Sequence, residues 1–144
     1  RTYRKAIDDY LESPEKYQEN LEWYREEIGK CTYREFTTGF YFGKPGSDTQ
    51  IYDNSTYVKN YTYLGTVEEK DGRGFARIEQ KNKFSVGETI EIMKPDGRNV
   101  EVTVKGIFRE DGESQESAPH PQQVLFIDLD GQAEPYDILR KRED

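Results

Sequence analysis

The sequence is poor in the residue types that most often carry nucleophilic or metal chemistry. Among its 144 residues there is one cysteine, Cys31, and one histidine, His120. A single cysteine excludes an internal disulfide and a metal cluster held by several thiolates, and it suits a reducing compartment. The chain therefore offers few side chains from which an active site could be assembled, and we expect no cofactor in it.

Long apolar stretches are also absent. No run approaches the length of about 20 residues that a membrane-spanning helix needs, and no signal peptide is visible. The chain opens at Arg1 rather than at methionine, from which we expect a piece of a longer protein. We expect a cytoplasmic location and no membrane partner.

Aliphatic residues are scarce. Leu, Ile, Val and Phe together make up about a fifth of the chain, and the net charge is −8, a composition close to that of disordered proteins. Eleven Tyr, seven Phe and one Trp argue against disorder, because these side chains bury large areas. We therefore expect one modest folded domain with a core rich in Tyr and Phe.

Residues 1–30 have the pattern of a helical lead-in. Apolar residues recur at helical spacing, first at Tyr3, Ala6, Ile7, Tyr10 and Leu11, then at Tyr17, Leu21, Tyr24 and Ile28. Ser13 and Pro14 end one helix and begin the next, and Gly29 is a suitable stop. The pattern predicts two short helices, with Asn20 as a position where the second could divide. Neither is long enough to be stable alone, so each must pack on another element.

Residues 31–60 show no regular period and contain the glycines and prolines of a connecting loop. The loop is unusually aromatic, especially at Phe40, Tyr41 and Phe42. A loop of this kind either packs between the helices and the rest of the protein or presents a patch to a partner. Packing is the favoured reading. The loop glycines are followed by no phosphate-binding Lys-Ser/Thr pair.

Residues 61–144 alternate between apolar and polar side chains, which is typical of β-strands. Turn sequences separate the runs, as at Lys70-Asp71-Gly72 and Lys94-Pro95-Asp96-Gly97. Five or six short strands at this spacing predict a small barrel or sandwich. A closed β-barrel is favoured because closure removes exposed strand edges. The predicted fold class is therefore mainly β, preceded by two short α-helices and an aromatic loop.

Four stretches resemble a known family. They are Arg34-Glu35-Phe36-Thr37-Thr38-Gly39-Phe40-Tyr41-Phe42-Gly43-Lys44-Pro45, Ile78-Glu79-Gln80-Lys81-Asn82-Lys83-Phe84-Ser85-Val86-Gly87, Ala118-Pro119-His120-Pro121-Gln122, and Pro135-Tyr136-Asp137-Ile138-Leu139-Arg140. Together they resemble the C-terminal region of peptidase family U-32, the collagenase-like proteases. The chain departs from many relatives at Tyr33, where we would expect histidine.

The resemblance implies a β-barrel similar to the second domain of elongation-factor-like GTPases. It also implies that the family's catalytic region, with the cysteines that bind an iron–sulfur cluster in some members, lies N-terminal to this module. Family members are linked to two activities, collagen-type peptidase action and hydroxylation of uridine in transfer RNA. The module alone does not choose between them.

Two surfaces are candidates for contact with a partner or substrate. One is the aromatic group Phe40, Tyr41 and Phe42. The other is a basic stripe of Arg77, Lys81 and Lys83 beside Phe84, which has the composition of an RNA contact. An ordinary solvated strand face is the competing interpretation of the stripe, and the negative net charge favours it.

Catalytic and metal sites have little support in the sequence. Cys31, His120 and an acid such as Asp128 could form a nucleophilic triad, but no motif places them together. The acidic run at 110–116 lacks the ligand spacing of a calcium loop. An inert cysteine, a structural histidine and a solvated acidic surface are the expected outcomes.

The leading hypothesis is a non-catalytic accessory domain of a U-32 family peptidase. It would position substrate or stabilise the N-terminal catalytic domain of the same chain. The alternative is an RNA-contacting accessory domain of a member that hydroxylates uridine in transfer RNA. A third hypothesis is a module for self-association.

Overall fold

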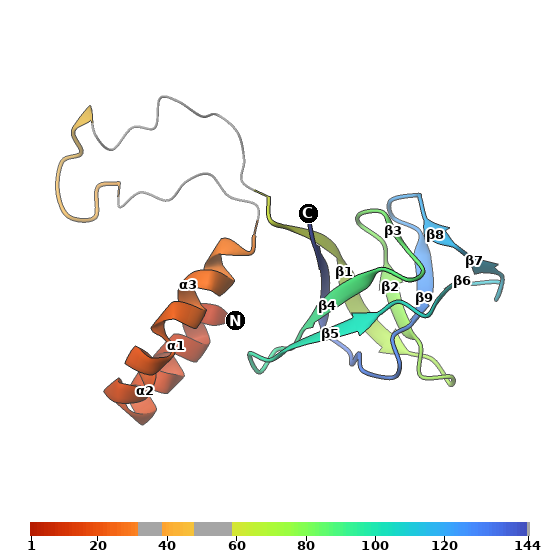
Figure 1. Cartoon of the computed structure of the whole chain (residues 1–144), viewed down its shortest axis with the longest axis horizontal. Helices are drawn as coiled ribbons and strands as arrows, with labels where there is room; N and C mark the ends of the chain where they lie inside the picture. Colours follow the sequence, from red (N-terminus) through yellow and green to blue (C-terminus); the bar gives the residue numbers. More distant parts are fainter. Residues whose placement is uncertain (32–38, 48–58, 144) are drawn as a thin grey trace.

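The computed structural model describes residues 1–31, 39–47 and 59–143, and in this part of the chain three helices precede a set of short strands (Figure 1). The helices are α1 (Thr2–Glu12), α2 (Pro14–Glu19) and α3 (Leu21–Gly29). The strands are β1 (Tyr61–Lys70), β2 (Ala76–Glu79), β3 (Phe84–Ser85), β4 (Thr89–Met93), β5 (Asn99–Thr103), β6 (Gly106–Arg109), β7 (Ser114–Gln115), β8 (Ser117–Ala118), β9 (Val124–Asp128) and β10 (Ile138–Arg142).

The helical lead-in has three helices where the sequence pattern predicted two. Ser13 separates α1 from α2 as expected, and its hydroxyl accepts a hydrogen bond from the backbone N–H of Lys16. The second break is at Asn20, whose side chain donates to the Asp9 carboxylate at 3.1 Å. This contact ties Asn20, which lies between α2 and α3, to α1. Among the described residues, none of the helices combines the length and the hydropathy needed to cross a bilayer.

Eight strands form one antiparallel sheet in the order β5-β4-β10-β1-β2-β9-β6-β7, and β3 pairs with β8. Strand β1 pairs with β10 through residues 61–66 and with β2 through residues 67–70. The register of β1 shifts between Tyr63 and Gly65 against β10 and between Val67 and Glu69 against β2, on either side of the change of partner. The sheet therefore curls along this part of β1. Within the described strands, β5 and β7 are the ends of the order and do not pair with each other. The architecture is therefore a curled half-barrel, and the prediction of a closed barrel is corrected.

The core lies inside the curl and is mostly aliphatic. One face of each strand supplies it because successive side chains alternate between the two faces. The expected Tyr- and Phe-rich core is not what the described part contains, since Phe84 is the only aromatic side chain in the core cluster. The members of this cluster are Leu64, Val67, Ala76, Ile78, Phe84, Ile90, Ile92, Val104, Ile107, Ala118, Leu125, Ile127, Leu129, Ala133 and Leu139.

Candidate functional site

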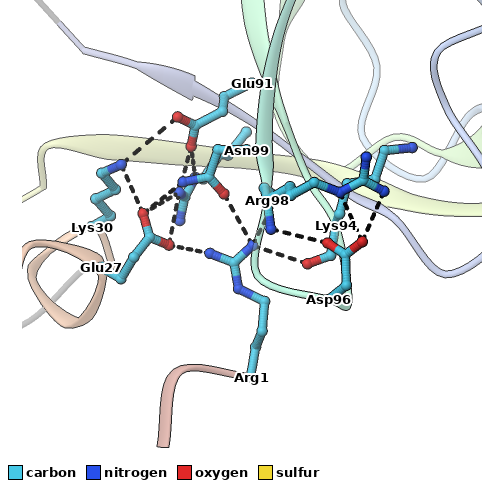
Figure 2. A network of polar contacts seen from close by, with 9 residues as sticks. Arg1, Glu27, Lys30, Glu91, Lys94, Asp96, Arg98 and Asn99 are labelled. Carbon is cyan, nitrogen blue, oxygen red and sulfur yellow. Dashed lines mark hydrogen bonds and ion pairs between the residues drawn. The ribbon is translucent and has the colours of Figure 1, made fainter. Parts of the chain in front are cut away.

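A buried polar network joins α3 to the outer face of the sheet (Figure 2). Its centre is Glu27, which is 6% exposed. The Glu27 carboxylate accepts hydrogen bonds from Nη2 of Arg140 at 3.1 and 3.2 Å and from the amide of Asn99 at 2.8 Å. Lys30 and Arg1 form ion pairs with the same carboxylate. One helix residue is thereby bound to strands β5 and β10 at once.

The pairing of β10 with β4 places Arg140 beside Glu27. Arg140 of β10 lies directly opposite Glu91 of β4, so both side chains project from the same face of the sheet. The neighbouring Leu139 points the other way, into the core. Arg140 also lies over the ring of Tyr61, at 5.0 Å from the ring centroid.

Arg1 ties the start of α1 to the turn between β4 and β5. Its guanidinium donates to the carbonyl oxygen of Lys94 and to Oδ1 of Asn99, both at 3.0 Å. The guanidinium also faces the Trp23 ring at 5.6 Å. We call helices α1 to α3 the helical hairpin. Both of its ends are thus attached to the sheet by charged or polar contacts.

Burial disfavours the ionised form of Glu27, but the hydrogen bond from Lys30 and the charge of Arg140 outweigh it and lower the pKa of this carboxyl below its ordinary value. Within the hairpin, the buried Asp9 accepts a hydrogen bond from the Tyr24 hydroxyl at 2.6 Å. This bond, with those from Lys5 and Asn20, lowers the pKa of Asp9 to about 2. Burial and the same contact raise the pKa of Tyr24 to about 12.

A groove runs beside this network, between the end of α3 and strands β1, β4 and β10. Two adjoining depressions of about 560 and 610 Å³ share Tyr61, Arg142 and Glu143 in their walls. The first also contains Glu88, Glu91 and Glu101, so its carboxylates outnumber its cations. This charge balance does not suit the binding of a phosphate backbone.

The predicted aromatic surface is exposed. Phe40, Tyr41 and Phe42 are 80%, 85% and 82% exposed, and Tyr41 contacts Phe42 edge to face. These rings therefore do not fasten the helices to the sheet, as the favoured reading of the loop had it. The remainder of the 31–60 loop lies largely outside the described residues.

The predicted basic stripe is largely paired with acids. Arg77 of β2 forms an ion pair with Glu68, and Lys81 forms one with Glu79. Lys83 is exposed and has no ion-pair partner among the described residues. Phe84 is 1% exposed and belongs to the core, so burial removes it from the candidate contact surface.

The residues of the conceivable triad have separate local partners. The Cys31 thiol is exposed and donates to the carbonyl oxygen of Ile28. The Asp128 carboxylate accepts from the backbone N–H of Asp130. His120 is an exposed turn residue. Over residues 1–31, 39–47 and 59–143, no group of three His, Cys, Asp or Glu side chains is arranged to hold a metal ion.

Sequence reasoning missed Glu27, Arg140 and Arg1 as a unit. One signal was present, because Glu27 shares a helix face with Tyr24 and Ile28, and a charged residue on an apolar face needs a buried partner. The partner could not be identified, since Arg140 is 113 positions away along the chain.

The comparisons with known proteins agree with this architecture. The sequence profile of the Peptidase family U32 C-terminal domain matches residues 59–140. The tRNA hydroxylation protein P1 of Bacillus subtilis (strain 168) is 33% identical over 140 residues, which are 96% of this chain and 33% of that protein. The tRNA hydroxylation protein P of Escherichia coli (strain K12) is 30% identical over 128 residues, or 88% of this chain and 27% of that protein.

A solved structure is also similar. The C-terminal domain of a U32 peptidase-family protein from Geobacillus thermoleovorans has a TM-score of 0.50 and 30% identity, covering 56% of this chain and 99% of that domain. A second crystal structure of the same domain has the same TM-score and 28% identity.

The fold, with the polar network centred on Glu27, defines a curled antiparallel β module whose outer face carries the helical hairpin. The chain belongs to peptidase family U32, and residues 59–140 match the family's C-terminal domain. The resemblance inferred from the four sequence stretches is confirmed. The chain spans about a third of the length of the curated relatives it matches.

Proposed function

We propose that this chain is a non-catalytic C-terminal module of a U32-family protein that hydroxylates transfer RNA. The observation that carries the proposal is the 33% identity to the Bacillus subtilis tRNA hydroxylation protein P1, which extends over 96% of this chain. The similarity therefore includes the helical hairpin as well as the sheet. Such continuous similarity is expected when both parts serve the same role in the two proteins.

The role proposed for the module is to support and position the catalytic region. Buried charge pairs centred on Glu27 join the hairpin to the sheet, and a second buried pair, Lys94 with Asp137, holds the end of β4 against the start of β10. Such buried contacts fix the hairpin and the strands at defined positions, which suits a part that positions another domain. A role in direct RNA contact is assigned to Lys83, with Arg77 and Lys81 as weaker contributors because their charges are already paired.

The test is a genetic one. Cells that cannot hydroxylate their tRNA receive a gene for the complete protein or the same gene with the segment encoding this 144-residue chain removed. Hydroxylated uridine in total tRNA is then measured by mass spectrometry. We expect the modification to fall at least about ten-fold with the truncated gene while the remaining protein stays soluble. Undiminished modification would contradict the proposal.

RNA contact is tested separately by titrating tRNA into the complete protein at two salt concentrations. Replacing Lys83 by alanine is expected to weaken binding and to lower the salt dependence by about one phosphate contact. Lys105→Ala is the matched control, because Lys105 is exposed but paired with Asp130 at 2.8 Å. Equal binding by both variants and the parent removes Lys83 from the interface.

A second candidate function is the accessory domain of a peptidase, positioning a protein substrate. The description of the similar Geobacillus thermoleovorans domain as part of a U32 peptidase favours it. In this case the truncation above leaves hydroxylated uridine unchanged, and the purified complete protein cleaves a collagen-type peptide only when the module is present.

A further inference from the structure

Helix α1 turns its apolar face outward, toward solvent. Tyr3, Ile7, Tyr10 and Leu11 of α1 are 75%, 55%, 56% and 76% exposed. The residues of α1 that point toward the rest of the molecule are polar: Lys5 approaches the β4–β5 turn, and Asp9 is buried against Tyr24. In a self-contained domain, an amphipathic helix at the surface normally packs its apolar face against the core.

The outward face is a continuous surface, which we call the α1 apolar surface. It forms a shallow groove of about 440 Å³ lined by Tyr3, Ala6, Ile7, Tyr10, Leu11 and Tyr17. Tyr17 contacts Tyr10 edge to face and stacks on Tyr24, with ring centroids 5.7 and 5.6 Å apart. Because Tyr24 is buried, this row of rings holds the surface in a fixed shape.

The charges at the rim of this surface are already paired with each other. Arg4 pairs with Asp8 at 3.0 Å, and Lys16 pairs with Glu12 at 2.6 Å. A nucleic acid or another anionic partner would need free cations at this place. The partner is therefore an apolar, weakly charged protein surface.

Covalent linkage favours a partner within the same polypeptide over a second copy. Its exposed apolar area is roughly 500 Å², since large apolar side chains contribute about 200 Å² each when fully exposed. A standard interface between separate molecules buries about 800 Å² from each partner, of which somewhat more than half is apolar, so this surface is large enough for one whole contact. A tethered neighbour occupies such a surface in preference to a free molecule, because linkage raises its effective concentration. The curated relatives are about three times as long as this chain and so contain such a neighbour.

We propose that the α1 apolar surface is the docking site for the remaining part of the U32 polypeptide, the region that precedes the C-terminal domain in the family. This inference rests on family membership and on the supporting role proposed above, and it holds whether or not transfer RNA is the substrate.

Hydroxyl-radical footprinting tests the proposal by measuring side-chain oxidation in the 144-residue chain and in the complete protein, with the dose fixed by a reporter peptide. We expect oxidation of Tyr3, Ile7 and Leu11 to fall at least five-fold in the complete protein, at low and at 0.5 M salt. Equal oxidation in both proteins would overturn the proposal. So would protection that salt abolishes, or protection that grows with the concentration of the 144-residue chain together with a dimer mass in light scattering.

A pair of variants provides the control. Leu11→Glu and Gln18→Glu each add one negative charge at an exposed helix position, and only Leu11 lies on the α1 apolar surface. Both variants of the 144-residue chain should unfold at the parent's denaturant midpoint. In the complete protein, Leu11→Glu should restore oxidation of Tyr3, whereas Gln18→Glu should leave it protected. Identical behaviour of the two variants in the complete protein contradicts docking at this surface.

Discussion

Buried charges make single residues unusually important at the junction between helices and sheet. Glu27 is expected to be the most sensitive, because its removal leaves Arg140 and Arg1 partly buried without their shared carboxylate. Glu27→Ala should lower the free energy of unfolding by about 3 kcal/mol, as measured by urea denaturation. The neighbouring Glu26→Ala is the control, since Glu26 is exposed, and it should change stability by less than about 0.5 kcal/mol. Equal effects of the two substitutions would refute the network.

Asp9 predicts a pH dependence inside the hairpin. Its pKa of about 2 lies below the ordinary value of 3.8, so the ionised group stabilises the fold fully above about pH 4. This contribution is lost as the pH falls through 2. Unfolding free energies measured from pH 6 to pH 2 should therefore decline less steeply for Asp9→Asn than for the parent. Asp8→Asn, the same change at an exposed position of the same helix, is the control for the altered net charge.

At the scale of the elements, β1 is the strand on which the curl depends. Gly65 lies at its bulge, and a Cβ there would lie 3.0 Å from the carbonyl oxygen of Glu79 and 3.2 Å from Cδ1 of Ile78. Gly65→Ala should therefore destabilise the protein by about 1–2 kcal/mol in chemical denaturation. Gly72→Ala has open space around it and should remain within about 0.5 kcal/mol of the parent. A neutral Gly65→Ala would contradict this and show that Glu79 and Ile78 can move to make room for the methyl group.

For the whole molecule, the sheet should fold without the helices. The core cluster lies entirely within residues 64–139, and the similar solved domain covers 56% of this chain. A fragment of residues 59–144 should unfold cooperatively, with strand-type circular dichroism, at a lower urea midpoint than the full chain. The loss reflects the contacts of Arg140 and Asn99 with Glu27. A fragment that fails to unfold cooperatively would make the hairpin part of the folding core.

The sequence predicted the elements better than their arrangement. Helical spacing and the Ser13-Pro14 break marked the hairpin, and the period-two pattern marked the strands from residue 61. The closure of the barrel was wrong because pairing between distant strands leaves no local pattern, and the bend at Gly65 becomes visible only once β1 has two partners. The candidate stripe failed at Phe84 for a similar reason, since its burial depends on β8.

Local patterning by itself determined that the helical part ends near residue 30 and that the strands begin at residue 61, because each pattern depends on residues close together in the chain. Only the tertiary structure decided which face of α1 meets solvent and which charges are shared across the junction. The physical reason is that Glu27 and Arg140 are 113 residues apart, and their pairing draws the polar side of the hairpin inward at the expense of its apolar side.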